Sequence, residues 1–287
     1  MAVASHVLAA GRIARYIEPG VGVVATQAHV LMAHGERTLS GMRAGLGPEA
    51  ALAESIAMDE NPRVRQVAAV SAGGDVAAHT GDGCIREAGH VIGDGFSAQA
   101  NMMLQGGVPE AMAEAFTRSA GQGLAARLLA ALDTAEAHGG DIRGRQAAAL
   151  VVVAPEPSGD PLVDGVVDVR VDDDPEPLPH LRRLTSLALA NQRLDVADGL
   201  VAAGEMAGAA EAYREAVEAA PSYLEFSFWQ SATLAEVGAV DEARQAWAPI
   251  DTSDQRARWA DLLGRCVGAG LLQPGVAETL LGARPAL

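Results

Sequence analysis

The sequence predicts two parts: a layered α+β domain in which two helix layers enclose two sheets, followed by an all-helical tail. Short strand-like runs separated by Gly-rich turns indicate antiparallel sheets, and the predicted helices come in pairs between sets of strands. Helices placed in this way must cover opposite faces of the sheets, which gives the order helix, sheet, sheet, helix. Helical character throughout the residues after about 178 predicts the tail.

The first three predicted strands are short runs bounded by turn signals. The opening residues are small and apolar, and Pro19-Gly20 is a turn signal that precedes VGVVATQ, a run typical of a buried strand. Helical character follows, and Gly47-Pro48-Glu49 marks a helix start ahead of an apolar face. The predicted ranges are strands over 1–5, 12–17 and 21–27, and then the helical region.

Four strands, two helices and two final strands complete the predicted domain. Gly73-Gly74 separates two apolar runs in VAAVSAGGDVAAHTG, which is a good hairpin signal. The stretch 155–164 is expected to be an exposed loop. The predicted ranges are strands over 65–71, 75–80, 89–92 and 96–102, helices over 109–118 and 124–138, and strands over 146–153 and 166–171.

A boundary is expected near residue 178, so that a first domain covers 1–177 and a helical domain covers 178–287, with 181–194 as a connecting helix. The tail contains two copies of a 34-residue pattern typical of tetratricopeptide repeats. In each copy a Gly ends one helix, a small residue lets two helices approach, and an aromatic residue wedges between neighbours. The second copy is imperfect, because Ile250 stands where the first has the small residue Ala216. The matched positions are Gly204, Ala209 and Tyr213, then Gly238, Ala243 and Trp247.

Composition and charge limit the possible functions. The 287 residues are 49% hydrophobic but only 3% aromatic, so the core must consist of Ala, Val and Leu. A formal net charge of −16 argues against nucleic acid or an anionic membrane as partner. All 21 residues counted as Lys or Arg are Arg, which excludes a Schiff-base lysine, a pyridoxal-phosphate lysine and a Walker-type phosphate lysine.

Cysteine usage and hydropathy point to a reducing compartment. Cys84 and Cys266 fall in different predicted domains and neither belongs to a CxxC pair, so we expect no disulfide, no metal site and no cofactor. The chain opens without a signal-peptide pattern, and no apolar run approaches the roughly 18 residues that a membrane span needs. We therefore expect a soluble, cytoplasmic protein.

Six strings carry a family resemblance, in unbroken order over residues 2 to 177. They are EPGVGVVATQA (18–28), VAAHTGDGCI (76–85), AGHVIGDGFSAQANMM (88–103), AMAEAF (111–116), LLAALDTAEAHGGDIRGRQAAALVV (128–152) and VDVRVDDDPEP (167–177). Together they resemble the family known as domain of unknown function 1028, whose members look like N-terminal-nucleophile (Ntn) hydrolases in fold. The resemblance implies a four-layer αββα sandwich of the Ntn type, and some members carry helical-repeat tails.

An Ntn hydrolase attacks an amide with the hydroxyl or thiol of its own first residue, and the free α-amino group serves as the base. Family members begin with an additional strand before the run that matches Ala2 to Ser5, and that strand is missing here. Met1 is no nucleophile, and its removal would expose Ala2, which has no hydroxyl. Either the real start lies upstream, or this copy has lost the strand and the chemistry. We favour the first reading, because loss of a core strand exposes apolar surface and an unpaired edge.

The string DIRGRQ supplies the charged candidates for a site. Asp141 precedes the penultimate strand, where proteasome-like Ntn enzymes hold an Asp that supports the terminal amine, so the resemblance makes it a second-shell candidate. Arg143 and Arg145 alternate along the same stretch, which would send both to one face where they could bind a carboxylate. The alternative is an Asp–Arg ion pair at a strand end. Ala147 stands where the family often has Ser, which weakens the catalytic reading.

Polar residues near strand ends supply candidates for substrate binding. Thr26 and Gln27 end an inner strand and could line a pocket, although such residues are commonly turn anchors. Gln99 and Asn101 point to the same side of their strand and could donate hydrogen bonds to a substrate. The alternative is that they satisfy buried backbone groups.

The histidines and the first serine are weaker candidates. His79 and His90 lie on adjacent predicted strands and could bind a substrate, a metal or a proton, but no third ligand appears at useful spacing, which favours a structural role. Ser5 has a hydroxyl, but no neighbouring His or Asp makes it more than a strand-end serine, so a Ser-His-Asp triad is not expected.

Three functional hypotheses remain open. The first is an Ntn-type amidohydrolase acting on a small amide or peptide bond, and it rests on fold-level resemblance. The second is a catalytically silent scaffold that assembles through its helical tail. The third is a binding module in which Arg143 and Arg145 hold an anion. We expect a homo-oligomer, with a protein partner for the tail as a further option.

Overall fold

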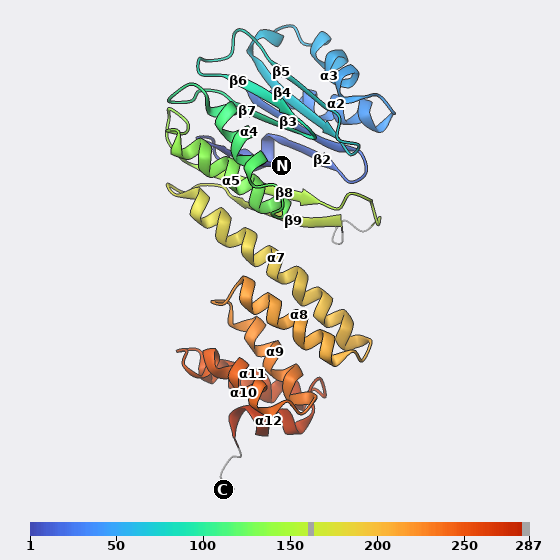
Figure 1. Ribbon diagram of the computed structural model, residues 1–287, viewed down its shortest axis with the longest axis vertical. Coiled ribbons are helices and arrows are strands. Elements are labelled where there is room, and N and C mark those ends of the chain that lie inside the picture. Colours follow the sequence, from blue (N-terminus) through green and yellow to red (C-terminus); the bar gives the residue numbers. More distant parts are fainter. Residues whose placement is uncertain (160–163, 283–287) are drawn as a thin grey trace. The chain divides into compact units, whose positions relative to one another are not determined.

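The computed structural model describes residues 1–159 and 164–282; part of the predicted 155–164 loop lies outside the described residues. The chain divides into two compact units, Met1–Thr185 and a second that starts at Ser186. The first is a mixed α+β unit with antiparallel sheets, and the second is helical, as predicted (Figure 1). The four-layer Ntn arrangement and the exact domain boundary stay predictions.

The strands of the first unit form three antiparallel groups. The largest is a four-stranded sheet in the order β2-β3-β4-β5, next to the hairpin β6-β7. The third is a sheet in the order β1-β8-β9. The strands are β1 (Ala2–Ser5), β2 (Arg15–Glu18), β3 (Gly22–Ala28), β4 (Arg65–Ser71), β5 (Val76–Thr80), β6 (Gly89–Gly93), β7 (Phe96–Ala100), β8 (Ala147–Val153) and β9 (Gly165–Val171).

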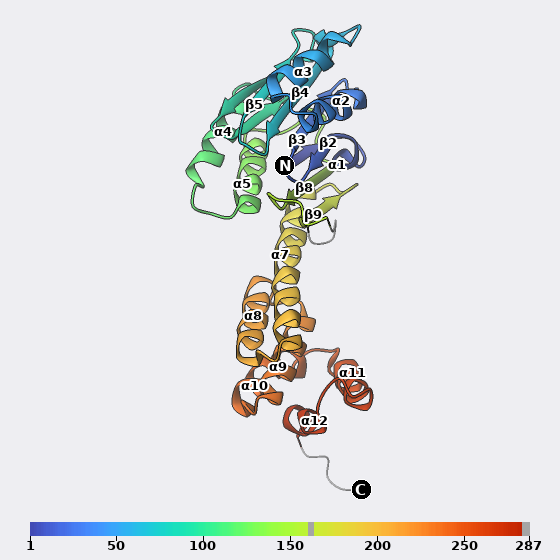
Figure 2. The same ribbon diagram turned by 90° about the vertical axis from the view of Figure 1, so that its right-hand side faces the viewer.

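Two helix pairs lie between these sets of strands, as the sequence predicts. The pair α2 and α3 packs on the four-stranded sheet, whereas α4 contacts β6 and β7 and α5 contacts β1 and β8. Figure 2 shows the two pairs on opposite sides of the four-stranded sheet. The helices are α1 (Ala10–Ile13), α2 (Met32–Arg43), α3 (Pro48–Ala57), the 3-10 turn η1 (Pro62–Val64), α4 (Val108–Arg118) and α5 (Leu124–Ala137).

The strand predicted over 12–17 differs from the structure. Its first residues belong to the short helix α1, and the strand starts only at Arg15. Ala9 has a left-handed backbone (φ 55°) and turns the chain into α1. Gly11 then packs so closely on β8 that an added Cβ would lie 2.2 Å from the Ala149 Cβ. This contact is between segments far apart in sequence, so local periodicity could not indicate it.

The second unit starts at Ser186, within α7, and its described residues form helices. The predicted connecting helix 181–194 is the middle of the longer helix α7. Gly204 and Gly238 follow helix ends with left-handed φ values of 77° and 78°. Tyr213 and Trp247 are both buried, at 2% and 0% exposed. The helices are α7 (Pro177–Ala202), α8 (Met206–Ala219), α9 (Leu224–Glu236), α10 (Val240–Asp251), α11 (Arg256–Gly268) and α12 (Pro274–Leu281).

Among the described residues, no helix is both long enough and apolar enough to cross a membrane.

A buried polar cluster holds the α2–α3 pair to the sheet. His34 in α2 lies 2.9 Å through Nδ1 from the Ser55 Oγ of α3, and 2.8 Å through Nε2 from Asp59 Oδ2. Arg65, the first residue of β4, donates from Nε to the same Asp59 oxygen at 2.7 Å. The side chains of His34 and Asp59 are 0% and 4% exposed. Ser55 is 1% exposed, so this Ser-His-Asp arrangement is closed to substrate and stabilises the fold.

Removing Asp59 tests this role. The Arg65 hydrogen bond holds the pKa of the Asp59 carboxyl well below its ordinary value. A depressed carboxyl pKa gives stability that is present above the unfolded pKa of about 3.9 and is lost as the pH falls below it. We expect Asp59→Ala to lower the free energy of unfolding by about 2–4 kcal/mol at pH 7, and by less at pH 3. Urea unfolding at both pH values measures this. Asp82→Ala, in an exposed ion pair with Arg63, should change little; an equal loss in both variants would contradict the proposed role.

Candidate functional site

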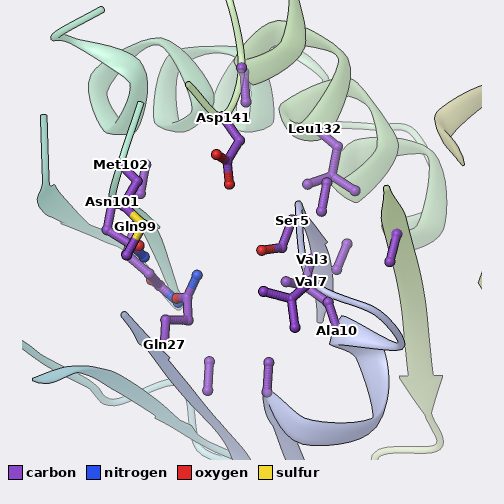
Figure 3. Close-up of a pocket in the computed structure, with 18 of the residues that line it drawn as sticks. Val3, Ser5, Val7, Ala10, Gln27, Gln99, Asn101, Met102, Leu132 and Asp141 are labelled. Atoms are coloured by element: carbon purple, nitrogen blue, oxygen red, sulfur yellow. The ribbon is translucent and has the colours of Figure 1, made fainter. Parts of the chain in front are cut away.

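A pocket of about 180 Å³ lies at the end of β1, between the ends of β3 and β7 and the turn that precedes β8. Figure 3 shows its polar groups: the Asp141 carboxylate, the Ser5 hydroxyl and the Gln27 amide point into the cavity. All but one of the predicted site residues line this pocket: Thr26, Gln27, Gln99, Asn101, Asp141, Arg143 and Arg145. The structure therefore brings together residues that are more than a hundred positions apart in sequence.

Asp141 and Arg143 form one wall as an ion pair. Arg143 donates from Nε to Asp141 Oδ1 at 2.9 Å and from Nη2 to Oδ2 at 2.6 Å, and its backbone N–H donates to Oδ1 at 2.9 Å. The backbone N–H of His6, just after β1, donates to Asp141 Oδ2 at 3.4 Å. Burial alone would raise the pKa of Asp141, but the Arg143 hydrogen bonds and charge outweigh it and lower the pKa. The carboxylate is thus held ionised beside the end of β1.

The predicted strand alternation of Arg143 and Arg145 is not observed. Both precede β8, which begins at Ala147, and they lie in a turn and a coil segment. Arg145 pairs with Glu136 and Glu176, so its charge is already neutralised, whereas Arg143 pairs with Asp141. Of the two, Arg143 has the single carboxylate partner, and its side chain is 36% exposed. It is the better candidate for an anion contact.

The opposite wall carries neutral amides. The Gln27 Oε1 is buried and has no hydrogen-bond partner in the part of the chain that the structure describes. Ser97 Oγ donates to Gln99 Oε1 at 2.8 Å, which leaves the Gln99 amide nitrogen for a ligand. Asn101 donates from Nδ2 to Gln66 Oε1 at 2.9 Å, which leaves the Asn101 amide oxygen. Thr26 contributes only to the wall, because its hydroxyl donates to the Leu31 carbonyl at 3.5 Å.

Gln66 is a supporting residue that the sequence reasoning missed. It lies on β4 and is 1% exposed. Its Nε2 approaches Thr80 Oγ1 at 3.0 Å, the Gly89 carbonyl at 3.1 Å and the Ala100 carbonyl at 2.9 Å. With its contact to Asn101, this one amide links the four-stranded sheet to the β6-β7 hairpin. A Gln inside a predicted buried strand was the available signal.

His79 lies outside the pocket, so the substrate-binding role expected for it has no support from its position. Its Nε2 lies 2.9 Å from the Pro62 carbonyl, which it anchors. His90 Nδ1 lies 2.8 Å from Thr80 Oγ1, and burial, followed by the nearby His79, lowers the pKa of His90. Among residues 1–159 and 164–282, no group of three or more His, Cys, Asp and Glu is placed to hold a metal ion.

A second pocket of about 260 Å³ continues from the first, because Met1, Ala2 and Gln99 line both. Its walls are mostly apolar. They come from β3, β4, β7, α4 and α5, and include Val23, Ala25, Ala68, Val70, Ala98, Phe116 and Leu132. The polar pocket therefore opens into an apolar trough beside β1.

Comparison with known proteins shows which family the first part of the chain matches. The model described as "Family of unknown function (DUF1028)" matches residues 1–181. The crystal structure of protein SPO2555 from Silicibacter pomeroyi, described under the same family, is 31% identical, with a TM-score of 0.57. The similarity covers 64% of this chain and 79% of that one. No curated protein matches.

Replacing Gln66 tests how the amide wall is held. We expect Gln66→Leu to lower the free energy of unfolding by about 2–4 kcal/mol, because the buried acceptors of Gly89 and Ala100 lose their donor. The Asn101 side-chain amide should also lose its single environment in NMR spectra. Gln146→Leu is the matched control, since the Gln146 side chain makes an exposed hydrogen bond to Asp173. Equal stability of the two variants would show that Gln66 does not organise this wall.

Proposed function

The chain belongs to the family of unknown function DUF1028, and on that premise we propose that its first unit is an Ntn-type amidohydrolase domain. In this proposal the polar pocket holds a small amide or a peptide-like substrate. The observation that carries it is the convergence of three neutral amides and an Asp–Arg pair on one cavity at the end of β1.

The chemistry of the walls suits an amide ligand. The Gln99 nitrogen and the Asn101 oxygen offer one donor and one acceptor, and Gln27 offers both in a single unpartnered side chain. An amide needs the same complement, one acceptor for its N–H and donors for its C=O. Arg143 adds a cation that suits a substrate carboxylate.

In the proposed reaction, the hydroxyl or thiol of a first residue attacks the amide carbon, and its α-amino group takes the proton. The C–N bond then breaks, the amine leaves with that proton, and water hydrolyses the resulting ester or thioester. Asp141 would act as a positioning residue. Its carboxylate lies beside the end of β1 and already accepts the His6 N–H. An ionised carboxylate there would stabilise a nearby ammonium.

The silent scaffold is the alternative within this proposal. It assigns assembly to tetratricopeptide-type helix pairs, supported by the buried aromatic residues Tyr213 and Trp247 at matching repeat positions. The same proposal includes a homo-oligomeric assembly in the cytoplasm. Turnover or ligand binding in the pocket would argue against the catalytically silent scaffold. A pocket that binds none of the ligands tested below would favour it.

Ligand binding to the pocket tests the substrate class. N-acetylglycine carries both an amide and a carboxylate, and at ten times its Kd it should stabilise the protein by about 1.4 kcal/mol in thermal unfolding. We expect Arg143→Ala to weaken this binding about tenfold or more, because the carboxylate loses a charged donor. Arg170→Ala is the control, since Arg170 pairs with Asp172 away from the pocket. Equal stabilisation by acetate would instead indicate a simple anion-binding module.

The identity of the N-terminal residue of the mature protein tests the proposed Ntn reaction. We expect protein purified from its native host to begin with Thr, Ser or Cys and to release amine from N-acyl amino acids or small peptides. Replacing that residue with Ala should abolish turnover while ligand binding persists. N-terminal sequencing and intact mass identify the residue. A mature terminus at Met1 or Ala2 would exclude this mechanism.

A further inference from the structure

Strand β9 forms the outer edge of the sheet β1-β8-β9. Among the described residues it pairs with β8 alone, in a register that includes Leu150↔Val169 and Val151↔Asp168. An uncovered edge presents N–H and C=O groups that can pair with a further strand. The side chains of Asp168 and Arg170 are 58% and 46% exposed, which leaves this part of β9 accessible to a partner.

The hydrogen-bond phase shows which backbone groups of β9 are available. The Val151 N–H donates to the Met1 carbonyl at 2.8 Å, so the backbone groups of Val151 face away from β9. Successive residues of a strand face opposite sides, so the residue before Val151 and its partner Val169 join β8 to β9. The N–H and C=O groups of Asp168 and Arg170 therefore point away from β8, toward the free edge.

The end of the strand agrees with this phase. Asp172 lies two residues beyond Arg170, and its carbonyl accepts the Ala9 N–H at 3.0 Å. This contact also closes the edge at that end, whereas a register shift interrupts the ladder near the start of β9. The free segment therefore consists of the three residues from Asp168 to Arg170, with outward backbone groups at the first and the third.

The charges on this free segment are complementary to those of a second copy. Asp168 and Arg170 lie on the same face of β9, because side chains two residues apart point the same way. A symmetric antiparallel contact is isologous, so both copies use the same residues. With the two-fold axis at Val169, Asp168 lies opposite the partner's Arg170, and Arg170 lies opposite the partner's Asp168.

The other registers bring like charges together. The phase allows the axis at Asp168, at Val169 or at Arg170, because outward backbone groups must meet outward groups. An axis at Asp168 places that carboxylate against its own copy, and an axis at Arg170 does the same with the guanidinium. Like charges directly opposite are destabilising. Charged edge residues normally discourage pairing with another chain; here their opposite signs favour one of the three registers.

Intrachain ion pairs extend this pattern of charges. Arg15 Nη1 donates to Asp168 at 2.8 Å, and Arg170 Nε lies 3.1 Å from Asp172. Across the two copies the row of charges becomes Arg15, Asp168, the partner's Arg170 and the partner's Asp172, which alternate in sign. Exposed ion pairs contribute little singly, whereas a network of several charges contributes more.

We propose that the chain forms a two-fold symmetric homodimer in which β9 pairs antiparallel with the β9 of a second copy, centred on Val169. Each Asp168 exchanges both backbone hydrogen bonds with the partner's Arg170. Three residues a strand bury less than the roughly 800 Å² per partner of a stable complex, so the dimer is reversible and depends on concentration. The contact goes beyond the proposed function, since it requires neither amidohydrolase activity nor the helical tail.

Charge reversal on the edge tests this dimer. Sedimentation equilibrium of the full chain at increasing concentration should show a monomer–dimer equilibrium. Asp168→Arg brings guanidinium groups together across the axis, and Arg170→Asp brings carboxylates together. We expect each substitution to raise the dimer Kd about tenfold or more, because two attractive pairs become repulsive.

A mixture of the two variants is the decisive comparison. In the mixed dimer the two guanidinium groups of the Asp168→Arg chain face the two carboxylates of the Arg170→Asp chain. We therefore expect a heterodimer about as stable as the wild-type dimer. Each variant has lost an intrachain ion pair, with Arg15 or with Asp172, and mixing cannot restore it. Recovery in the mixture thus identifies a contact between chains.

Hydrogen exchange provides a measurement without any substitution. As the concentration rises into the dimer range, the Asp168 and Arg170 amides should exchange about tenfold more slowly. The Val169 amide, which faces β8, should be protected throughout and serves as the internal control. A chain that stays monomeric, or a mixture that forms no heterodimer, would overturn the proposal. Variants that dimerise like the wild type would place the contact elsewhere, for example in the helical tail, and would overturn it as well.

Discussion

The rest of the first unit depends on one constraint: strands β3 and β4 are apolar on both faces. Val24, Val67 and Ala69 are nearly inaccessible and pack with α2 and α3. Their neighbours Val23, Ala25, Ala68 and Val70 point the other way and line the apolar trough. A sheet of this kind must be covered on both sides, because each exposed apolar face costs free energy in proportion to its area. The helix pair α2–α3 covers one face; β7, α4, α5 and the space beside β1 lie over the other.

The polar groups inside the first unit have two separate roles. The His34–Ser55–Asp59 cluster and the Gln66 amide tie elements together where no water reaches, and neither offers an open functional group. The pocket at the end of β1 differs, because Gln27, Gln99 and Asn101 each keep hydrogen-bonding capacity that the fold does not use. Unused capacity on one cavity wall is costly for stability, and it marks the place where a ligand is expected to supply the missing partners.

Much of the fold was predictable because it follows from local sequence patterns. The order of strands and helix pairs follows from turn signals and apolar runs, and each of the nine strands in the described part of the chain lies within a few residues of its expected range. Two of the errors have local causes. Strand β7 ends at Ala100 rather than 102 because Met102 adopts a left-handed backbone (φ 55°). The residues Arg143 and Arg145 alternate in sequence like strand residues, yet they precede β8, since Asp141 binds the Arg143 backbone and side chain and forms a turn.

The sequence by itself determined the class of the fold, the helical nature of the described residues after about 178, and seven of the residues that line the polar pocket. It did so because hydrophobic period, turn residues and the positions of strand ends are properties of short segments. Only the tertiary structure decided which candidates meet. It placed Asp141 beside His6, moved His79 away to the Pro62 carbonyl, and made Gln66 the link to Asn101. The pairing of β1 with β8, beside the apolar trough, joins residues about 145 positions apart, which no local pattern contains.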